Sequence, residues 1–125
     1  MVEPSETLQI VFDKATNDAK KLKHKYITLE HLTYAILCVE DFEKYVVEYG
    51  ADYNLMKSTL ESHIKNKMKD IEISEEEMQG KWKPTKTQSV ERVLNRAFAQ
   101  VLFQGRNTID IIDVFISILS EKKTY

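Results

Sequence analysis

The sequence has little of what turn-rich, disulfide-bonded or membrane-spanning proteins need. Its 125 residues include three glycines, two prolines and one cysteine. So few glycines and prolines argue against a turn-rich β protein, and a single cysteine, Cys38, excludes an internal disulfide bond. The longest apolar runs are about five residues, whereas a membrane-spanning helix needs about 20. We therefore expect a soluble protein of a reducing, cytoplasmic compartment.

The charge and the length of the chain exclude further classes of protein. The N-terminal stretch MVEPSETLQI is acidic where a signal peptide would need a basic region followed by an apolar core. The formal net charge is -2, which gives no reason to expect nucleic acid or an anionic membrane as a partner. A chain of 125 residues suits one compact domain that buries roughly two-thirds of its unfolded surface.

Apolar residues recur at helical spacing in the first half of the chain. The first predicted helix begins at Glu6 with Ser5 as its N-cap, and the second follows Thr28 as its N-cap. A short third helix covers the stretch FEKYVVEYG, where Gly50 can supply the left-handed residue that ends it. The fourth predicted helix follows Asp52 as its N-cap.

The pattern fails between residues 67 and 86 and then resumes. A fifth predicted helix begins at Gln88 or Ser89, and a sixth follows Asp110 as its N-cap. We find no convincing pair of strands, so the sequence predicts an all-α fold.

The two halves of the chain repeat each other at an offset of 82 residues. The matched apolar pairs are Leu8 with Val90, Val11 with Val93, Phe12 with Leu94, Ala15 with Ala97, Ala19 with Val101, Ile27 with Ile109, Leu32 with Val114, Ile36 with Ile118 and Leu37 with Leu119. The N-caps Thr28 and Asp110 also match. The stretch VLFQG, residues 101–105, resembles a picornaviral 3C protease site, but in this register Gly105 ends the fifth helix opposite Lys23. We interpret it as part of the fold.

Catalytic and nucleotide-binding patterns are missing from the sequence. A P-loop needs two glycines five residues apart followed by lysine, and each glycine here is isolated. Cys38 and His31 would lie about 10 Å apart along one helix, too far for His31 to activate the thiol. The three histidines, His24, His31 and His63, lack metal-ligand spacing. We expect no catalytic residue, no metal and no cofactor.

Two segments resemble a known family. Tyr26–Leu37 reads YITLEHLTYAIL and is similar to the T-x-E-H-L-L-x-A-L-L segment of the N-terminal domain of Clp/Hsp100 AAA+ unfoldases. Residues 92–121, RVLNRAFAQVLFQGRNTIDIIDVFISILSE, resemble the second repeat of that domain, most closely the ClpA type. The resemblance implies an all-α double Clp-N motif, a non-catalytic module that receives substrates and adaptor proteins for an ATPase ring.

The resemblance also implies a division of the chain. We expect one Clp-N-like domain over residues 1–125, with repeat one at 5–67, a linker at 68–86 and repeat two at 87–125. Repeat two would lack its last two helices. The apolar faces that those helices cover would then be exposed, capped by the linker or buried against another molecule, so we also expect a homo-oligomer.

The resemblance assigns a small set of binding residues. The ClpA-like surface for adaptors or substrates would use Glu30, Thr87 and Arg92. In ClpC-like relatives both copies carry the Glu and help to bind phosphoarginine, whereas here the second copy has Ile112 in that place. At most one phosphoarginine half-site is therefore expected, built from Ser5 and Glu30.

The leading functional hypothesis is a non-enzymatic protein-binding module. Its partners would be a Clp unfoldase, adaptor proteins or substrates, and it could modulate a Clp protease. One alternative is a small Clp-related hydrolase or peptidase that uses Cys38, His31 and Glu30. Another is a purely structural helical oligomer.

Overall fold

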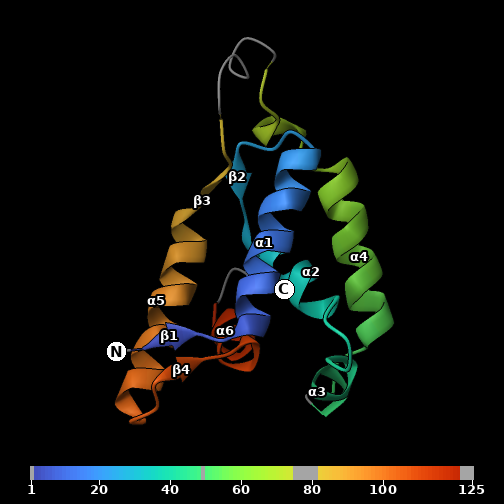
Figure 1. Ribbon diagram of the computed structural model, residues 1–125. Helices are drawn as coiled ribbons and strands as arrows, with labels where there is room; N and C mark the ends of the chain where they lie inside the picture. The colour runs from blue at the N-terminus through green and yellow to red at the C-terminus, as the bar shows by residue number, and fades with distance from the viewer. Residues whose placement is uncertain (1, 49, 75–81, 122–125) are drawn as a thin grey trace.

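The computed structural model describes residues 2–48, 50–74 and 82–121 and confirms the all-α class (Figure 1). The elements of the first half are β1 (Glu3–Pro4), α1 (Glu6–Lys21), β2 (Tyr26–Ile27), α2 (Leu29–Leu37), α3 (Glu43–Glu48) and α4 (Tyr53–Asn66). Those of the second half are the 3-10 turn η1 (Lys69–Ile71), β3 (Thr85–Lys86), α5 (Gln88–Phe103), β4 (Thr108–Ile109) and α6 (Ile111–Leu119).

Polar side chains begin the helices as the sequence predicts. Four predicted N-caps are confirmed, because a side-chain oxygen of each accepts a hydrogen bond from a backbone N–H of the helix it begins: Ser5, Thr28, Asp52 and Asp110. The α5 helix begins at Gln88, one of the two predicted starts, and its N-cap is Thr87. Local sequence therefore determines where these helices start.

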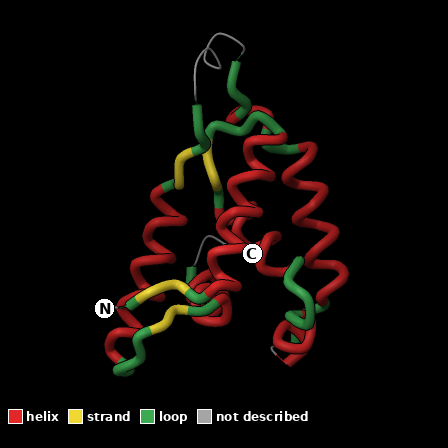
Figure 2. Tube along the Cα trace, in the orientation of Figure 1, coloured by secondary structure: helices red, strands yellow, loops and turns green. Residues whose placement is uncertain are grey.

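Two short parallel strand pairs correct the expectation that the chain forms none. β1 pairs with β4, and β2 pairs with β3, each over two residues (Figure 2). Two residues are too few to show the alternation of apolar and polar side chains that predicts a strand. Each strand lies directly before the N-cap of a helix, and the pairing arises because these extended residues lie next to each other in space.

Elements recur at the 82-residue offset found in the sequence. The bounds of α1 and α5, and of α2 and α6, differ by this offset, as do those of β1 and β3, and of β2 and β4. Each strand pair thus joins one half of the chain to the other. The C-terminal ends of α1 and α5 also match, because Lys23 and Gly105 both have positive φ, 61° and 75°. The VLFQG stretch is therefore the end of α5, not an appended tag.

The core lies among α1, α2, α5 and α6, with α2 at its centre. α2 contacts α1, α4, α5 and α6, and Figure 1 shows it between α1 and α4. The rings of Phe42 and Phe115 pack edge to face in this core, with 5.0 Å between the ring centroids. The predicted division into repeats at 5–67 and 87–125 with a linker stays a prediction, and residues 75–81 and 122–125 lie outside the described ranges.

Length and hydropathy decide whether a helix of the described residues could span a membrane. No helix there is both long enough and apolar enough to cross a bilayer.

Candidate functional site

The strand pair β2–β3 brings two of the predicted site residues to the same region. Glu30 lies in the first turn of α2, directly after β2, and Thr87 caps α5, directly after β3. The backbone N–H of Thr87 donates to the carbonyl of Ile27 at 3.2 Å, so the two helices start side by side. Arg92 follows on α5.

Arg92 is held by a carboxylate that the sequence analysis did not identify. Its Nε and Nη2 donate to the two carboxylate oxygens of Glu121, at 3.2 and 2.7 Å. Hydrogen bonds from Arg92 lower the pKa of Glu121, and Glu121 raises the pKa of Arg92. Arg96 donates to the same carboxylate at 3.2 Å. Two guanidinium groups therefore share one carboxylate, and the cluster keeps one surplus positive charge.

Arg96 is fixed in place by α6. Its Nε donates to the Ser117 hydroxyl at 3.0 Å, and its Nη2 donates to the Ser117 carbonyl at 2.7 Å. Ser117 is itself buried and donates its hydroxyl to the carbonyl of Val93 at 2.8 Å. A serine on an otherwise apolar helix face is the signal in the sequence that could have predicted this hydrogen-bonded contact between α5 and α6.

A pocket of about 180 Å³ lies next to Glu30, between α2, α4 and α6. The residues that line it are Leu29, Glu30, Thr33, Met56, Leu60, Ile118 and Leu119. We call it the Thr33 pocket. Thr33 is only 3% exposed, and its hydroxyl finds no hydrogen-bond partner within the described part of the chain. An apolar pocket with a few polar groups is the usual form of a binding site.

The predicted half-site of Ser5 and Glu30 is not assembled by any contact between them. Ser5 donates its hydroxyl to Asp110 at 2.8 Å, beside the β1–β4 pair, whereas Glu30 follows the β2–β3 pair. No hydrogen bond links Ser5 to Glu30 in the described ranges. Ile112, which stands where the second copy would need a carboxylate, packs against the core. A phosphoarginine half-site at these residues stays a prediction.

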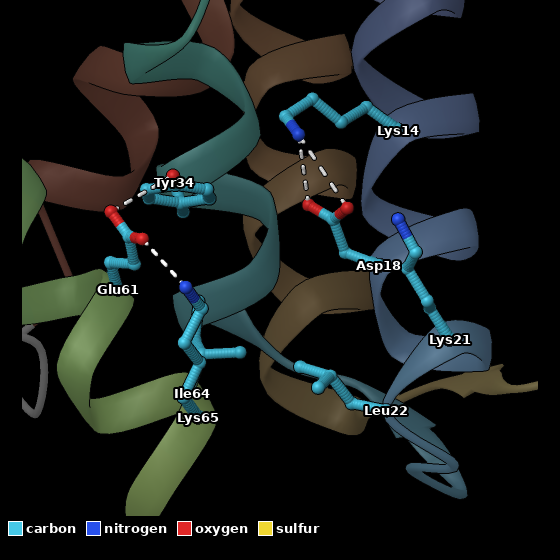
Figure 3. A pocket seen from close by; sticks show the side chains of 8 residues that line it. All are labelled: Lys14, Asp18, Lys21, Leu22, Tyr34, Glu61, Ile64 and Lys65. Atoms are coloured by element: carbon cyan, nitrogen blue, oxygen red, sulfur yellow. Dashed lines mark hydrogen bonds and ion pairs between the residues drawn. The ribbon is translucent and has the colours of Figure 1, made fainter.

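A second depression, of about 190 Å³, lies where α1, α2 and α4 meet (Figure 3). Its charged groups are largely paired with each other. Lys14 contacts Asp18 at 3.2 Å, and Lys65 contacts Glu61 at 2.8 Å. Tyr34 also donates to Glu61, at 3.3 Å. Figure 3 shows that each ion pair lies within one helix, α1 or α4, and that the Tyr34–Glu61 hydrogen bond joins α2 to α4. A ligand there would have to displace existing partners, so the Thr33 pocket is the better candidate.

The histidine that the hydrolase alternative would use is engaged elsewhere. His31 uses Nδ1 to accept from the backbone N–H of Thr28 at 2.9 Å, and its Nε2 lies 2.9 Å from Nδ1 of His24. Neither ring nitrogen of His31 is left to activate Cys38. Among residues 2–48, 50–74 and 82–121, no group of three or more potential metal-ligating side chains could hold a metal ion.

The sequence matches the family model described as the Clp repeat (R) N-terminal domain over residues 3–125. The chain belongs to this family. Its Clp-N identity is thus shown over nearly the whole chain, and the all-helical fold described above is the fold that the family predicts. The likeness to the ClpA type in particular stays a prediction.

Solved structures of other proteins share the fold of this Clp-N domain. The N-terminal domain of Hsp104 from Candida albicans superposes with a TM-score of 0.79 at 12% identity, over 96% of this chain and 75% of that one. A protein studied as part of a malarial protein secretion system gives 0.75 at 13% identity, over 94% and 77%. The N-terminal domain of the caseinolytic protease associated chaperone ClpD from Arabidopsis thaliana gives 0.65 at 12%, over 93% and 76%. At such identities the likeness shows the fold alone.

Proposed function

We propose that this Clp-N domain is a non-enzymatic module that binds adaptor or substrate proteins for a Clp unfoldase in the cytoplasm. Clp-N domains are non-catalytic N-terminal modules of unfoldases, which supports the proposal at the level of the family. The engagement of His31 with Thr28 and His24 argues against the hydrolase alternative. A homo-oligomer stays a prediction, which light scattering measures directly.

One observation carries the proposal: charged groups and an apolar pocket lie together around the start of α2. Glu30 lines the Thr33 pocket, as do Ile118 and Leu119 of α6. Glu121, which follows α6, holds Arg92 of α5. A protein segment could therefore insert an apolar side chain between charged groups of both signs. Protein interfaces are built in this way, with apolar anchors surrounded by a polar rim.

A photocrosslinker introduced in living cells tests this surface. We place the crosslinking residue at Glu91, an exposed position beside Arg92, and in a second variant at Gln9. Gln9 is a matched control because it is exposed, lies on α1 and is the counterpart of Glu91 at the 82-residue offset. The proposal predicts crosslinks from position 91 to a Clp unfoldase, its adaptor or its degradation substrates. No such protein at position 91, or capture from position 9 in its place, would contradict the proposal.

A further inference from the structure

We propose that α5 carries an interface for a second copy of this chain, in which the two α5 helices are antiparallel and cross at Phe98. Its centre is a row of three apolar side chains, Leu94, Phe98 and Leu102, spaced four residues apart along α5. We call this row the α5 stripe. A contact of the chain with itself goes beyond the proposed function, and it is tested on the purified chain alone.

The α5 stripe is exposed along an edge of the molecule. Phe98 is 42% exposed, Leu102 is 58% exposed, and Leu94 packs partly against the core. α5 packs mainly against α6, with further contacts to α2 and β4, and Figure 1 shows α5 at one edge of the fold. Side chains four residues apart form a ridge on a helix, and such a ridge packs into the groove of another helix. The α5 stripe therefore has the form of one side of a helix–helix contact.

The internal repeat shows that the fold does not require apolar residues in the exposed part of this stripe. At the 82-residue offset the counterparts of Phe98 and Leu102 are Thr16 and Lys20 of α1. The hydroxyl of Thr16 donates to a carbonyl of its own helix, and Lys20 is exposed. α1 packs on α2 as α5 packs on α6. The packing of α5 within the chain therefore needs no apolar side chain at either position.

The charges at the two ends of the α5 stripe favour a second copy in the antiparallel direction. Glu91 lies seven residues before Phe98, and Arg106 lies eight residues after it. When two α5 helices cross at Phe98 in antiparallel directions, Leu94 of one copy faces Leu102 of the other. Glu91 of one copy then lies opposite Arg106 of the other. A parallel pair would place like charges opposite each other at both ends.

Arg106 keeps donors for this second carboxylate. Its Nη1 and Nη2 donate to Asp113 at 3.3 and 2.5 Å, and its Nε donates to Gln104 at 2.9 Å. A guanidinium group has five N–H donors, so these three hydrogen bonds leave two N–H groups over. The side chain is 44% exposed. Asp113 therefore holds Arg106 in place without using all of its donors.

The size of the α5 stripe predicts a weak dimer. A stable protein–protein interface buries about 800 Å² per partner, which is more than one row of three side chains provides. At the crossing the ring of Phe98 would meet its own copy, and aromatic pairs attract each other beyond the burial of their surface. We therefore expect monomer and dimer in equilibrium, with a dissociation constant at or below about 1 mM.

Sedimentation equilibrium of the purified chain, at concentrations up to about 1 mM, tests the interface. The average mass should rise from that of one chain toward that of two. The double variant Phe98→Thr with Leu102→Lys carries the residues that α1 has at these positions, which already form a helix in this chain. Its dimer should be at least about tenfold weaker. Phe103→Ser is the control, because it removes a phenylalanine that is 93% exposed on α5 outside the stripe, and its dimer should be unchanged.

A charge substitution tests the direction of the two helices. In the antiparallel pair Glu91→Gln removes an attraction to Arg106, so the dimer should weaken by about two- to fivefold. In a parallel pair it would remove the repulsion between two carboxylates and strengthen the dimer. A dimer that Glu91→Gln strengthens or leaves unchanged would therefore contradict the antiparallel direction.

Two results would overturn the interface itself. One is a wild-type chain that keeps the mass of a single copy throughout the concentration series. The other is a dimer that the double variant at Phe98 and Leu102 leaves unchanged, or that Phe103→Ser weakens as much, because a different surface would then hold the copies together. Neither result depends on whether crosslinking from position 91 finds a Clp partner, so the interface and the proposed function succeed or fail separately.

Discussion

The Nδ1 atom of His24 lies 2.9 Å from the Nε2 atom of His31, and both imidazole rings are buried. The backbone N–H of Thr28 donates to Nδ1 of His31, so the ring hydrogen of His31 must be on Nε2. Nε2 of His31 then donates to Nδ1 of His24. This arrangement requires both histidines to be neutral, because an extra proton on either ring would place two donors opposite each other.

In the other half of the chain, two charged side chains make the corresponding connection between α5 and α6. At the 82-residue offset the counterparts of His24 and His31 are Arg106 and Asp113. Nη2 of Arg106 donates to Oδ1 of Asp113 at 2.5 Å, and Oδ2 of Asp113 accepts from the N-cap backbone of Asp110 at 2.9 Å. Both pairs tie the end of the first helix to the N-cap of the next one. The two halves should therefore respond differently to acid.

We expect acid to destabilise the chain through the histidine pair. Burial and the neighbouring His24 lower the pKa of His31 from 6.5 to about 4, and burial lowers the pKa of His24, opposed by Glu72. Since folding lowers these pKa values, the unfolded chain binds protons more readily than the folded one. The contribution of the neutral histidine pair to the free energy of unfolding is complete above pH 6.5 and is lost as the pH falls toward 4. His31 accounts for on the order of 3 kcal/mol of it. Urea unfolding between pH 7 and pH 4.5 measures it.

His31→Asn is the variant that isolates this effect. An asparagine at this position keeps an oxygen that can accept from the N–H of Thr28, as Asp113 does for Asp110. It removes the titrating ring. The dependence of unfolding free energy on pH between 6.5 and 4.5 should shrink by half or more. An unchanged dependence would show that other groups cause it.

The same substitution at two threonines should have opposite effects. Thr33→Val removes a buried hydroxyl without a partner among the described residues, so we expect it to raise the unfolding free energy by about 1 kcal/mol. Thr28→Val removes the oxygen that caps α2, so we expect a loss of about 1 kcal/mol. Thermal unfolding of both variants checks this, and destabilisation by Thr33→Val would mean that its hydroxyl is hydrogen-bonded in solution.

Gly105 and Lys23, the left-handed residues that follow α5 and α1, allow another matched pair of substitutions. Gly105 has φ +75° and open space where the side-chain carbon of an alanine would lie, so Gly105→Ala should cost about 1 kcal/mol from backbone strain alone. Its counterpart Lys23 already bears that strain, at φ 61°. Lys23→Gly should therefore stabilise the chain by up to about 1 kcal/mol. Denaturant unfolding of both variants gives the two signs, and a loss of stability in Lys23→Gly would contradict this explanation.

Sequence patterns predicted those parts of the structure that depend on neighbouring residues. Ser5 and Thr28 could be identified as N-caps because a cap bonds to the helix that directly follows it. The strand pairs and the Arg92–Glu121 contact could not, because the paired residues lie far apart in the chain and neither member shows a local pattern. Their closeness is produced by the packing of α5 on α6 and by the exchange of strands between the halves.

The pocket beside Thr33 could be predicted from the sequence only in part. Thr33 interrupts the apolar face of α2, and it aligns with Phe115 at the 82-residue offset. The alignment of the two halves therefore already contained a signal for the pocket. That signal could show only that a ring was replaced by a smaller polar residue. The space beside Thr33 depends on α4 and α6, whose positions no local pattern gives.

The affinity for the partner captured from position 91 tests the proposed binding surface most directly. Isothermal titration of that purified protein would compare the wild-type chain with Arg92→Ala and with Lys20→Ala, a control that removes the same charge from an exposed site on α1. Binding through the surface of Glu30, Thr87 and Arg92 predicts at least about fivefold weaker binding for Arg92→Ala and unchanged binding for Lys20→Ala. Equal affinity of all three proteins for the partner would contradict it.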